Sequence, residues 1–524
     1  MNIVRLRHIF FSTLFSGIFL LSACDSDDTS TPNDDIDKEV IVPVKWQLPV
    51  GHFIPAKMNM HLVYPRADDE TRAHARHKFA HPNMLYEIPI GVQGGAWPFK
   101  YELIQKPEGA TIGEAHGSDK YGTVSWLAPA SGTYTFEVKI TDQELNTVTA
   151  SWQVVIDASK FLFIQDGYAG TKVGTIDQPL EDIADWYKGD RTDTTYHNRI
   201  VVFRGGNYNL IGDPRNGNNI RLDTATKTAS LIGYPGETPI IDCSKAKILT
   251  DDGLDDIFVA DIRWENGRQD VPNAHFFWAI GDINRATWWR NHFHNLGPGL
   301  VGTDNTMPVF VSATSSLKEN ILYKENNHTQ INNIDYNGAY FEAYFSNYVL
   351  IEQNIASDSA TESGFYAKGT RAYVSIRANT AINNVRGVQL DVGNGTEAGV
   401  GIIPHDHEIC WNNVRAPLDN ALMMSASNDY AGIFYSTHLY RNTIVADTAW
   451  VRFLGAENYK VDGNVVITND MYSPLSRWNT SIMDSDYVSN LTSDGTEQFV
   501  DVEGKLQGEF RTLYLGTHGH EVAF

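Results

Sequence analysis

The chain has 524 residues, of which 42% are hydrophobic and 20% are charged, so it is long enough for two or three domains and too apolar for a wholly disordered protein. Its formal net charge of −23 repels polyanions, which argues against DNA and RNA as partners. Only one stretch is apolar enough for a membrane, and the 42 glycines and 24 tyrosines favour a soluble, turn-rich β-protein.

The first 23 residues have the features of a signal peptide. Arg5 and Arg7 precede an apolar run over residues 9–21, which is shorter than the ~20 residues of a membrane-spanning helix. The run ends in Leu21-Ser22-Ala23-Cys24, which resembles the lipobox of bacterial lipoproteins. That resemblance implies cleavage before Cys24, attachment of a lipid such as palmitate, and anchoring in the cell envelope, facing the periplasm or the cell exterior. The alternative is an ordinary signal peptide with a chance cysteine.

Two regions follow the signal peptide. Residues 24–40 are acidic and lack aromatic side chains, which predicts a flexible tether. Residues 41–157 alternate apolar and polar side chains, most clearly over 133–142, which predicts a β-sandwich. The Pro107-Glu108-Gly109-Ala110-Thr111 run and the Gly-Thr-Tyr-Thr-Phe strand from Gly132 resemble bacterial Ig-like, cadherin-like modules. Such modules usually space or present a neighbouring domain.

The remaining residues, 158–524, contain a repeated strand that ends in asparagine. The repeat recurs at Asn291, Asn326, Asn354, Asn379, Asn413, Asn442 and Asn464. By subtraction the spacings are 35, 28, 25, 34, 29 and 22 residues, the irregular period of a solenoid with variable loops. Asparagine tolerates left-handed turns and can form hydrogen bonds with copies of itself in the coils above and below, so we interpret these residues as structural.

Two segments support the same architecture by resemblance. Residues 167–180 and 233–242 resemble the opening segment and a turn-and-strand unit of pectate-lyase-like β-helix proteins. The predicted fold class is therefore all-β, with an N-terminal Ig-like β-sandwich followed by a right-handed, single-stranded parallel β-helix and a C-terminal cap. Cys243 and Cys410 are about six coils apart, or ~29 Å at ~4.8 Å per coil, so no disulfide can join them and we expect both to be buried.

A second strand in each coil supplies the candidate site. Aligned on a small first residue, residues 338–342, 364–368, 387–391 and 421–425 form one register. Alternation then places four side chains in the core, namely Phe341, Ala367, Leu390 and Met424. It stacks three ionisable side chains on one exposed face with three polar neighbours, namely Glu342, Lys368 and Asp391 with Tyr340, Tyr366 and Gln389. This face predicts either a structural ladder of alternating charge, worth about 0.2–1 kcal/mol per pair, or a substrate groove in which the tyrosines stack on sugar rings.

One mechanism for such a groove is β-elimination. Glu362, Lys368, Asn379-Thr380 and Asn383 resemble the core of the alginate lyase and chondroitinase B group of polysaccharide lyases. That resemblance implies that Lys368 is the base that removes the proton beside a uronate carboxylate. The family places an arginine one coil later, where this chain has Asp391, and the flanking carboxylates would keep the lysine protonated.

Several residues could replace the missing arginine. Arg377 or Arg386 could bind the substrate carboxylate, or Lys368 could neutralise it while Tyr366 moves the proton. A bound Ca²⁺ ion could do the same, although the sequence supplies no site for it, and no other cofactor is implied.

Two other functions remain open. In a glycoside hydrolase Glu342 would be the general acid and Asp391 the base, two coils or ~9.6 Å apart, near the upper end of the ~6.5–9.5 Å range for inversion. In a non-catalytic carbohydrate-binding or envelope protein the same groove would only bind. The preferred prediction is a monomeric, lipid-anchored protein that acts on an acidic polysaccharide, most readily as a lyase.

The histidines and the paired tryptophans are weaker candidates. His405-Asp406-His407, His292 and His294 lack the compact third ligand of a zinc site, so surface or stacking roles are preferred. One ring of Trp288-Trp289 must point into the core, and the other could flank a groove.

Overall fold

The computed structural model describes the chain from residue 58 with internal gaps. The described residues are 58–66, 75–187, 194–214, 217–222, 230–250, 254–267, 274–281, 283–297, 306–312, 318–333, 338–361, 364–368, 372–391, 405–415, 417, 421–425, 435–446, 451–454, 459–468, 475–478, 487–488, 491–493 and 499–522. The predicted signal peptide, Cys24 and the tether lie outside these residues. Among the described residues, no helix is both long and apolar enough to cross a membrane.

The first described strands are mainly antiparallel. The pair β1 (His61–Tyr64) and β4 (Gly91–Gln93) accompanies a four-stranded and a three-stranded sheet. The four-stranded sheet has the order β2 (Phe79–Ala80), β9 (Thr147–Ile156), β8 (Thr133–Thr141) and β5 (Lys100–Gln105). The three-stranded sheet has the order β3 (Leu85–Pro89), β7 (Thr123–Leu127) and β6 (Thr111–Ile112). Short 3₁₀ helices, η1 (Arg76–Lys78) and η2 (Ala158–Lys160), flank these strands in sequence.

These two larger sheets pack together through an aromatic core. Strand β9 alternates buried and exposed side chains, as the sequence pattern predicts for a sheet with one buried face. The Phe136 and Trp152 rings stack with centroids 5.3 Å apart, and the Trp126 ring of the other sheet meets Phe136 edge-on at 5.4 Å. The region is therefore a β-sandwich in its packing, and it is called the sandwich below.

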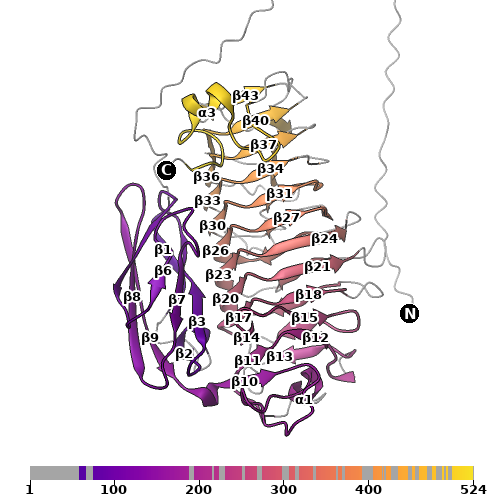
Figure 1. Cartoon of the computed structure of the whole chain (residues 1–524). Coiled ribbons are helices and arrows are strands. Elements are labelled where there is room, and N and C mark those ends of the chain that lie inside the picture. The colour runs from indigo at the N-terminus through magenta and orange to yellow at the C-terminus, as the bar shows by residue number, and fades with distance from the viewer. Residues whose placement is uncertain are drawn as a thin grey trace, which may run out of the picture. The chain divides into compact units, whose positions relative to one another are not determined.

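The rest of the chain forms a parallel β-helix, in which each sheet gains one strand per coil (Figure 1). The first sheet contains β10 (Phe161–Ile164), β11 (Ile200–Phe203), β14 (Ser230–Gly233), β17 (Ile257–Ala260), β20 (Ile283–Trp289), β23 (Lys318–Lys324), β26 (Ser346–Glu352), β30 (Ala372–Arg377), β33 (His405–Cys410), β36 (Tyr435–Tyr440), β39 (Tyr459–Asp462) and β42 (Tyr487–Val488). The second sheet contains β12 (Gly206–Asn209), β15 (Pro239–Asp242), β18 (Arg263–Glu265), β21 (His292–Leu296), β24 (Asn327–Asn333), β27 (Ile355–Ser357), β31 (Thr380–Ile382), β34 (Asn413–Arg415), β37 (Thr443–Ala446), β40 (Val465–Thr468) and β43 (Leu491–Ser493), and β28 (Ala360–Thr361) also pairs with β24. The third sheet contains β13 (Ile220–Leu222), β16 (Ile248–Thr250), β19 (Phe277–Ile280), β22 (Val309–Ser312), β25 (Phe341–Tyr344), β29 (Phe365–Lys368), β32 (Val388–Asp391), β35 (Leu422–Ser425), β38 (Val451–Leu454) and β41 (Leu475–Trp478).

An asparagine ladder joins successive coils between the first and second sheets. The backbone N–H of Asn326 donates to Asn354 Oδ1 at 2.8 Å, and Asn326 Nδ2 donates to the same oxygen at 3.1 Å. Asn326 Nδ2 also donates to the carbonyl of Trp288 at 2.9 Å. The pattern repeats along the ladder through Asn291, Asn326, Asn354, Asn379, Asn412, Asn442 and Asn464. The predicted structural role of the repeated asparagine is confirmed.

One position of the ladder differs from the prediction. Asn412, and not Asn413, accepts from Asn379, because β33 ends at Cys410 and one residue makes the turn. That residue, Trp411, has a φ of 59°, and Ala378 in the preceding coil has a φ of 54°. The left-handed conformation therefore belongs to the residue before each ladder asparagine. Asn413 instead begins β34 and donates to the carbonyl of Glu503 at 2.7 Å.

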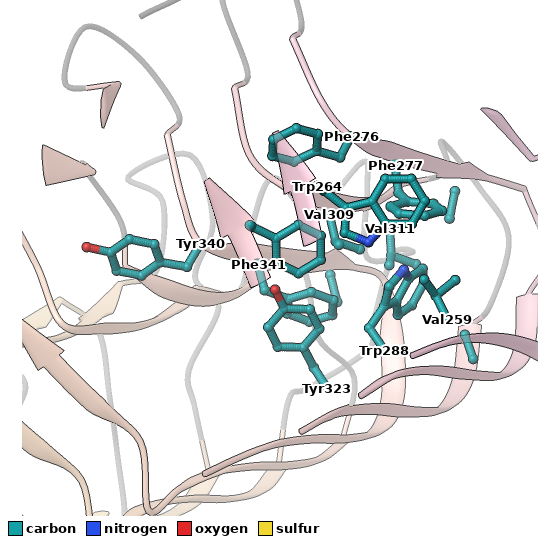
Figure 2. Close-up of a cluster of buried hydrophobic side chains, with 14 of the residues drawn as sticks. Val259, Trp264, Phe276, Phe277, Trp288, Val309, Val311, Tyr323, Tyr340 and Phe341 are labelled. Carbon is teal, nitrogen blue, oxygen red and sulfur yellow. The ribbon is translucent and has the colours of Figure 1, made fainter. Parts of the chain in front are cut away.

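The interior of the β-helix is filled by large apolar side chains. Figure 2 shows ten of them labelled, including Trp264, Trp288 and Phe341. Trp288 is fully buried, as expected for one member of the tryptophan pair. Cys243 and Cys410 are both free and buried. Cys243 follows β15 in the coil that begins with β14, and Cys410 ends β33, which lies six strands further along the first sheet. The predicted spacing and burial of the cysteines are therefore confirmed.

Each end of the helix core meets a short helix. The helix α1 (Ile183–Tyr187) places Ile183 and Trp186 in the interior beside the first coils. The helix α3 (Gly508–Tyr514) contributes Tyr514 to a separate apolar cluster with Val465 and Leu491 of the second sheet. These contacts shield apolar side chains that would otherwise face water at the last strands.

The sandwich contacts the outward face of the first sheet. Leu322 and Leu350 alternate with core residues along β23 and β26, so they point out of the helix and join the apolar core of the sandwich. Gln93 Nε2 donates to the carbonyl of Val349 at 3.0 Å. A Cβ placed on Gly91 would lie 2.9 Å from Leu322 Cδ2, so a larger residue at this position would require the Leu322 side chain to move.

Candidate functional site

The predicted site residues lie on the outward face of the third sheet. Cross-strand pairing aligns one row of outward positions, namely Trp278, Phe310, Glu342, Tyr366 and Gln389. A second row lies two residues further along each strand, namely Ile280, Ser312, Tyr344, Lys368 and Asp391. These two rows are called the third-sheet face below. The side chains of Ser312 and Asp391 lie outside the described part of the chain.

The register of one strand differs from the prediction by two residues. Lys368 pairs with Tyr344 on one side and with Asp391 on the other, whereas Glu342 pairs with Tyr366. The predicted stack of Glu342, Lys368 and Asp391 is therefore wrong. The cause is the turn before β25, which holds Ala339 and Tyr340 before the strand begins, whereas β29 begins directly after Gly364.

The error is an even number of residues, so it does not exchange the two faces of the strand. Phe341, Ala367 and Leu390 are fully buried in the core, as predicted. Met424, the fourth predicted core residue, lies on β35, but its side chain is outside the described part.

Lys368 packs its charged end against two tyrosine rings. Its Nζ lies 4.9 Å from the centroid of Tyr344 and 5.9 Å from that of Tyr366. A cation over an aromatic face gains about 0.5–1 kcal/mol where water still reaches it, and Lys368 and Tyr344 are both half-buried. Tyr344 was not among the predicted residues. Alternation along Phe341–Tyr344 would have identified it, because it follows Glu342 by two positions.

An aromatic strip continues from Tyr344 across the face. The Phe310 ring meets Tyr344 edge-on at 5.4 Å and stacks on Trp278 at 6.2 Å. At the far end Lys247 Nζ lies 4.7 Å from the Trp278 centroid. The strip therefore carries a lysine at each end, which is an arrangement suited to a ligand that combines flat apolar faces with negative charge.

Two predicted catalytic groups are covered. Glu342 is 0% exposed and Tyr366 is 2% exposed. A general acid must reach the glycosidic oxygen, so a fully buried Glu342 cannot act on a substrate in this conformation. In the strand register Asp391 is offset from Glu342 by two coils and two residues, so the two do not lie in one column as predicted.

Arg386 is the predicted arginine that reaches the third-sheet face. It is half-buried, and its Nη1 donates to Gln389 Oε1 at 3.4 Å. Gln389 is the cross-strand neighbour of Tyr366 and is 4% exposed. Arg386 therefore lies one coil beyond the strand of Lys368, beside Gln389.

Two predicted substrate-binding residues lie elsewhere. Arg377 is on the first sheet, is 1% exposed and binds Glu352 Oε2 through Nη2 at 2.7 Å and through Nε at 3.0 Å. Tyr340 is fully buried in the helix core, where its ring lies 5.2 Å from that of Phe365 (Figure 2). Tyr340 points inward because it precedes β25 in a turn, where strand alternation does not apply. Neither residue can contact a substrate on the third-sheet face.

The histidines form no catalytic constellation with Lys368. His292 and His294 lie on the second sheet, and each has a ring nitrogen 2.8 Å from Thr329 Oγ1. Burial, Arg263 and His294 lower the pKa of His292 to about 4. His407 is buried on β33, and the side chain of His405 lies outside the described part. Across the described residues, no group of three or more His, Cys, Asp or Glu side chains is placed to hold a metal ion.

Known proteins resemble this chain only weakly. No family model matches the chain, and no curated protein matches its sequence. A PL6 family polysaccharide lyase from Pseudopedobacter saltans is 10% identical, with a TM-score of 0.30 over 62% of this chain and 95% of that chain. A family 28 exopolygalacturonase from Yersinia enterocolitica is 7% identical, with a TM-score of 0.30 over 81% of this chain and 98% of that chain.

A third match is shorter. A candidate alpha-galactosidase from Bacteroides fragilis is 15% identical, with a TM-score of 0.14 over 24% of this chain, and the match spans 26% of that chain. Scores of this size carry no argument about activity. The parallel β-helix therefore rests on the strand pairing of this chain.

Proposed function

We propose that the third-sheet face binds an acidic polysaccharide and cleaves it by β-elimination. The single observation that carries this proposal is Lys368 Nζ, held 4.9 Å from the Tyr344 ring on the outward side of a parallel β-sheet. An ammonium group beside an aromatic ring can recognise a uronate, whose ring is flat and apolar and whose carboxylate is negative.

The chemistry assigns a role to each residue. After its ammonium group has given a proton to water, the neutral amine of Lys368 removes the proton on the carbon that carries the carboxylate. The electron pair forms a double bond to the neighbouring carbon, the bond from that carbon to the glycosidic oxygen breaks, and this oxygen takes a proton from water. Arg386 binds the carboxylate and stabilises the charge that develops on it. Tyr344 positions the sugar ring. Arg386 thus takes the part that the sequence resemblance gives to an arginine, in place of Asp391.

A specific observation favours a second candidate, a non-catalytic carbohydrate-binding protein. Glu342 and Tyr366, two ionisable groups of the face, are covered. Among the side chains of the face that the structure describes, Lys368 and Tyr344 are partly exposed and Glu342 is not, so these groups can bind a sugar without cleaving it. The hydrolase alternative is disfavoured by the burial of Glu342 and by its offset from Asp391.

The experiment is a screen of the purified protein against alginate, pectate and glycosaminoglycans, with ultraviolet absorbance as the readout for an unsaturated product. Lys368→Ala is expected to lower turnover by about 10²–10⁴-fold, the usual contribution of a general base. Lys505→Ala, a change at an exposed lysine near the C-terminus, is the control and should be silent. Full turnover by Lys368→Ala would refute the lyase, and binding without absorbance in the wild type would select the binder.

We further propose that Cys24 carries a lipid that anchors the protein in a bacterial cell envelope. The lipobox-like Leu21-Ser22-Ala23-Cys24 supports this proposal. The sandwich would then act as an Ig-like spacer between the tether and a monomeric β-helix, with domains at 41–157 and 158–524. Labelling cells with a fatty-acid analogue would test the anchor, since Cys24→Ala should abolish incorporation.

A further inference from the structure

A second concave site lies between the sandwich and the β-helix, away from the third sheet. Its volume is about 410 Å³, within the ~300–1,000 Å³ range of small-molecule sites. The sandwich contributes Arg76, Leu85 and Glu87, and the helix contributes Trp289, Arg290 and the turn over residues 233–238. It is called the junction pocket below.

The carboxylates of the junction pocket are already paired. Arg290 Nε and Nη2 bind both oxygens of Asp261 at 2.8 and 2.9 Å, and Nη2 also binds Glu87 Oε2 at 2.9 Å. Glu87 Oε1 accepts from Lys120 Nζ at 2.7 Å. These groups leave no free negative charge to repel an anion.

The third carboxylate of the pocket is neutralised in the same way. Glu237 accepts from Arg204 Nη2 at 2.6 Å and from the backbone N–H of Gly205 at 2.6 Å. The Arg204 guanidinium in turn lies 4.2 Å from the Tyr234 ring. The ion pair and the stacked ring fix one wall of the pocket.

Arg76 differs from the other cations of the pocket. It is 4% exposed, and among the described residues no carboxylate lies within ion-pair distance of it. Its Nη1 donates to the carbonyl of Phe79 at 2.8 Å, its guanidinium lies 4.8 Å from the Tyr86 ring, and its Nε has no hydrogen-bond partner in the described part. A buried cation with an unused donor is costly unless an anion completes it.

Charge in the junction pocket therefore favours a ligand with one negative group. The lining has two cations, Arg76 and Arg290, and three carboxylates, Glu87, Glu237 and Asp261. Lys120 and Arg204 bind Glu87 and Glu237 from outside the lining, so each of the three carboxylates has a cationic partner, whereas Arg76 has no carboxylate partner among the described residues. Tyr234, which is half-buried, adds an aromatic wall, and the almost fully buried Phe258 and Trp289 lie behind the lining. A planar guanidinium beside such a wall suits a carboxylate carried on a ring.

We propose that the junction pocket binds a single carboxylated sugar, such as a free uronate, with the carboxylate on Arg76. This site does not depend on Lys368 or on turnover at the third-sheet face. It would give the protein a sensor or product-binding site made jointly by the sandwich and the β-helix. Occupancy would also stabilise the contact between these two parts, because the ligand touches both.

The test measures binding of galacturonate and of neutral galactose to the full chain by calorimetry. We expect galacturonate to bind saturably and galactose at least tenfold more weakly. Arg76→Met should weaken galacturonate binding at least tenfold, whereas Arg263→Met, a change to a half-buried arginine on the second sheet, should not. No binding to the wild type, equal binding of the two sugars, or unchanged binding by Arg76→Met would overturn the proposal.

Two further variants separate this site from folding and from the proposed lyase. Thr238→Trp adds bulk at the exposed rim of the pocket and keeps Arg76, so it should block galacturonate even if Arg76→Met folds poorly. Galacturonate binding should survive Lys368→Ala. Loss of binding in Lys368→Ala, with binding intact in Thr238→Trp, would assign the sugar to the third-sheet face and reject the junction pocket.

Discussion

The outward faces of the first and third sheets carry similar charged rows but use them differently. On the first sheet the cross-strand row includes Lys324, Glu352 and Arg377. On the third sheet the corresponding row includes Tyr344, Lys368 and Asp391. Strand alternation directs both rows out of the helix, and only the first row is covered by the sandwich.

Because the sandwich covers the row on the first sheet, its charged side chains form a buried network of ion pairs. Lys324 Nζ lies 3.0 Å from Glu352 Oε1, Arg377 binds Glu352 Oε2 at 2.7 Å, and all three side chains are at most 1% exposed. Arg377 also donates to the carbonyl of Val92 in the sandwich. This is a ladder of alternating charge, one of the two alternatives that the sequence left open for the third sheet. Charge pattern alone therefore does not separate a structural row from a substrate face.

The largest expected effect comes from a substitution that breaks the ion pairs of the covered row. Glu352→Ala leaves Lys324 and Arg377 buried without their shared carboxylate, so the free energy of unfolding should fall by about 3–5 kcal/mol. Denaturant unfolding measures this loss. The matched change on the third-sheet face, Lys368→Ala, should cost less than about 1 kcal/mol, because Lys368 is only half-buried. Equal losses in the two variants would contradict the contrast between the faces.

The asparagine ladder provides the next test, because it fixes the register of both sheets. Asn412→Ala removes hydrogen bonds to Asn379, Asn442 and the carbonyl of Ile376, and should cost about 2–4 kcal/mol. Asn413→Ala should cost about 1 kcal/mol, because its amide donates to one carbonyl. The comparison of unfolding midpoints decides which asparagine belongs to the ladder.

Lowering the pH should destabilise the folded protein by protonating Glu352 on the covered face of the first sheet. Burial alone would raise the pKa of Glu352, but Arg377 and Lys324 together lower it below the usual value of 4.5. A lowered pKa means that the stabilisation is complete above pH 4.5 and is lost as the pH falls through the folded pKa, at up to about 1.4 kcal/mol per pH unit.

Glu408 in the same network should behave in the opposite way. Burial raises its pKa more than Arg377 lowers it, so its ionisation opposes folding as the pH rises through the folded pKa. Unfolding midpoints measured against pH should therefore flatten on the acid side in Glu352→Gln and on the neutral side in Glu408→Gln. Parallel curves for both variants and the wild type would show that neither carboxyl titrates as assigned.

The smallest expected effect is on ligand binding at the third-sheet face. Tyr344→Ala removes the ring beneath Lys368, so polysaccharide binding should weaken by a factor of about two to five, equivalent to ~0.5–1 kcal/mol. Tyr344→Phe keeps the ring and should bind as the wild type does. A loss in the phenylalanine variant would assign the effect to the hydroxyl group and not to the aromatic face.

Sequence reasoning identified the strands and most of their faces. Phe341, Ala367 and Leu390 point inward as predicted, because strand alternation depends only on neighbouring residues. It misplaced Glu342 by two positions, because the turn before β25 is longer than the turn before β29, and small residues at both turns look alike in sequence. It also placed Tyr340 on the surface, because alternation was extended beyond the strand.

The sequence by itself determined the repeated coil, the asparagine ladder and the burial of both cysteines, since these follow from periodicity and from hydrogen bonding between like residues. Only the tertiary structure decided which outward row the sandwich covers. Arg377 is buried because the sandwich, more than 200 residues earlier in the chain, packs against its sheet. Burial of that kind arises from contacts between distant segments, and no local pattern of residues encodes it.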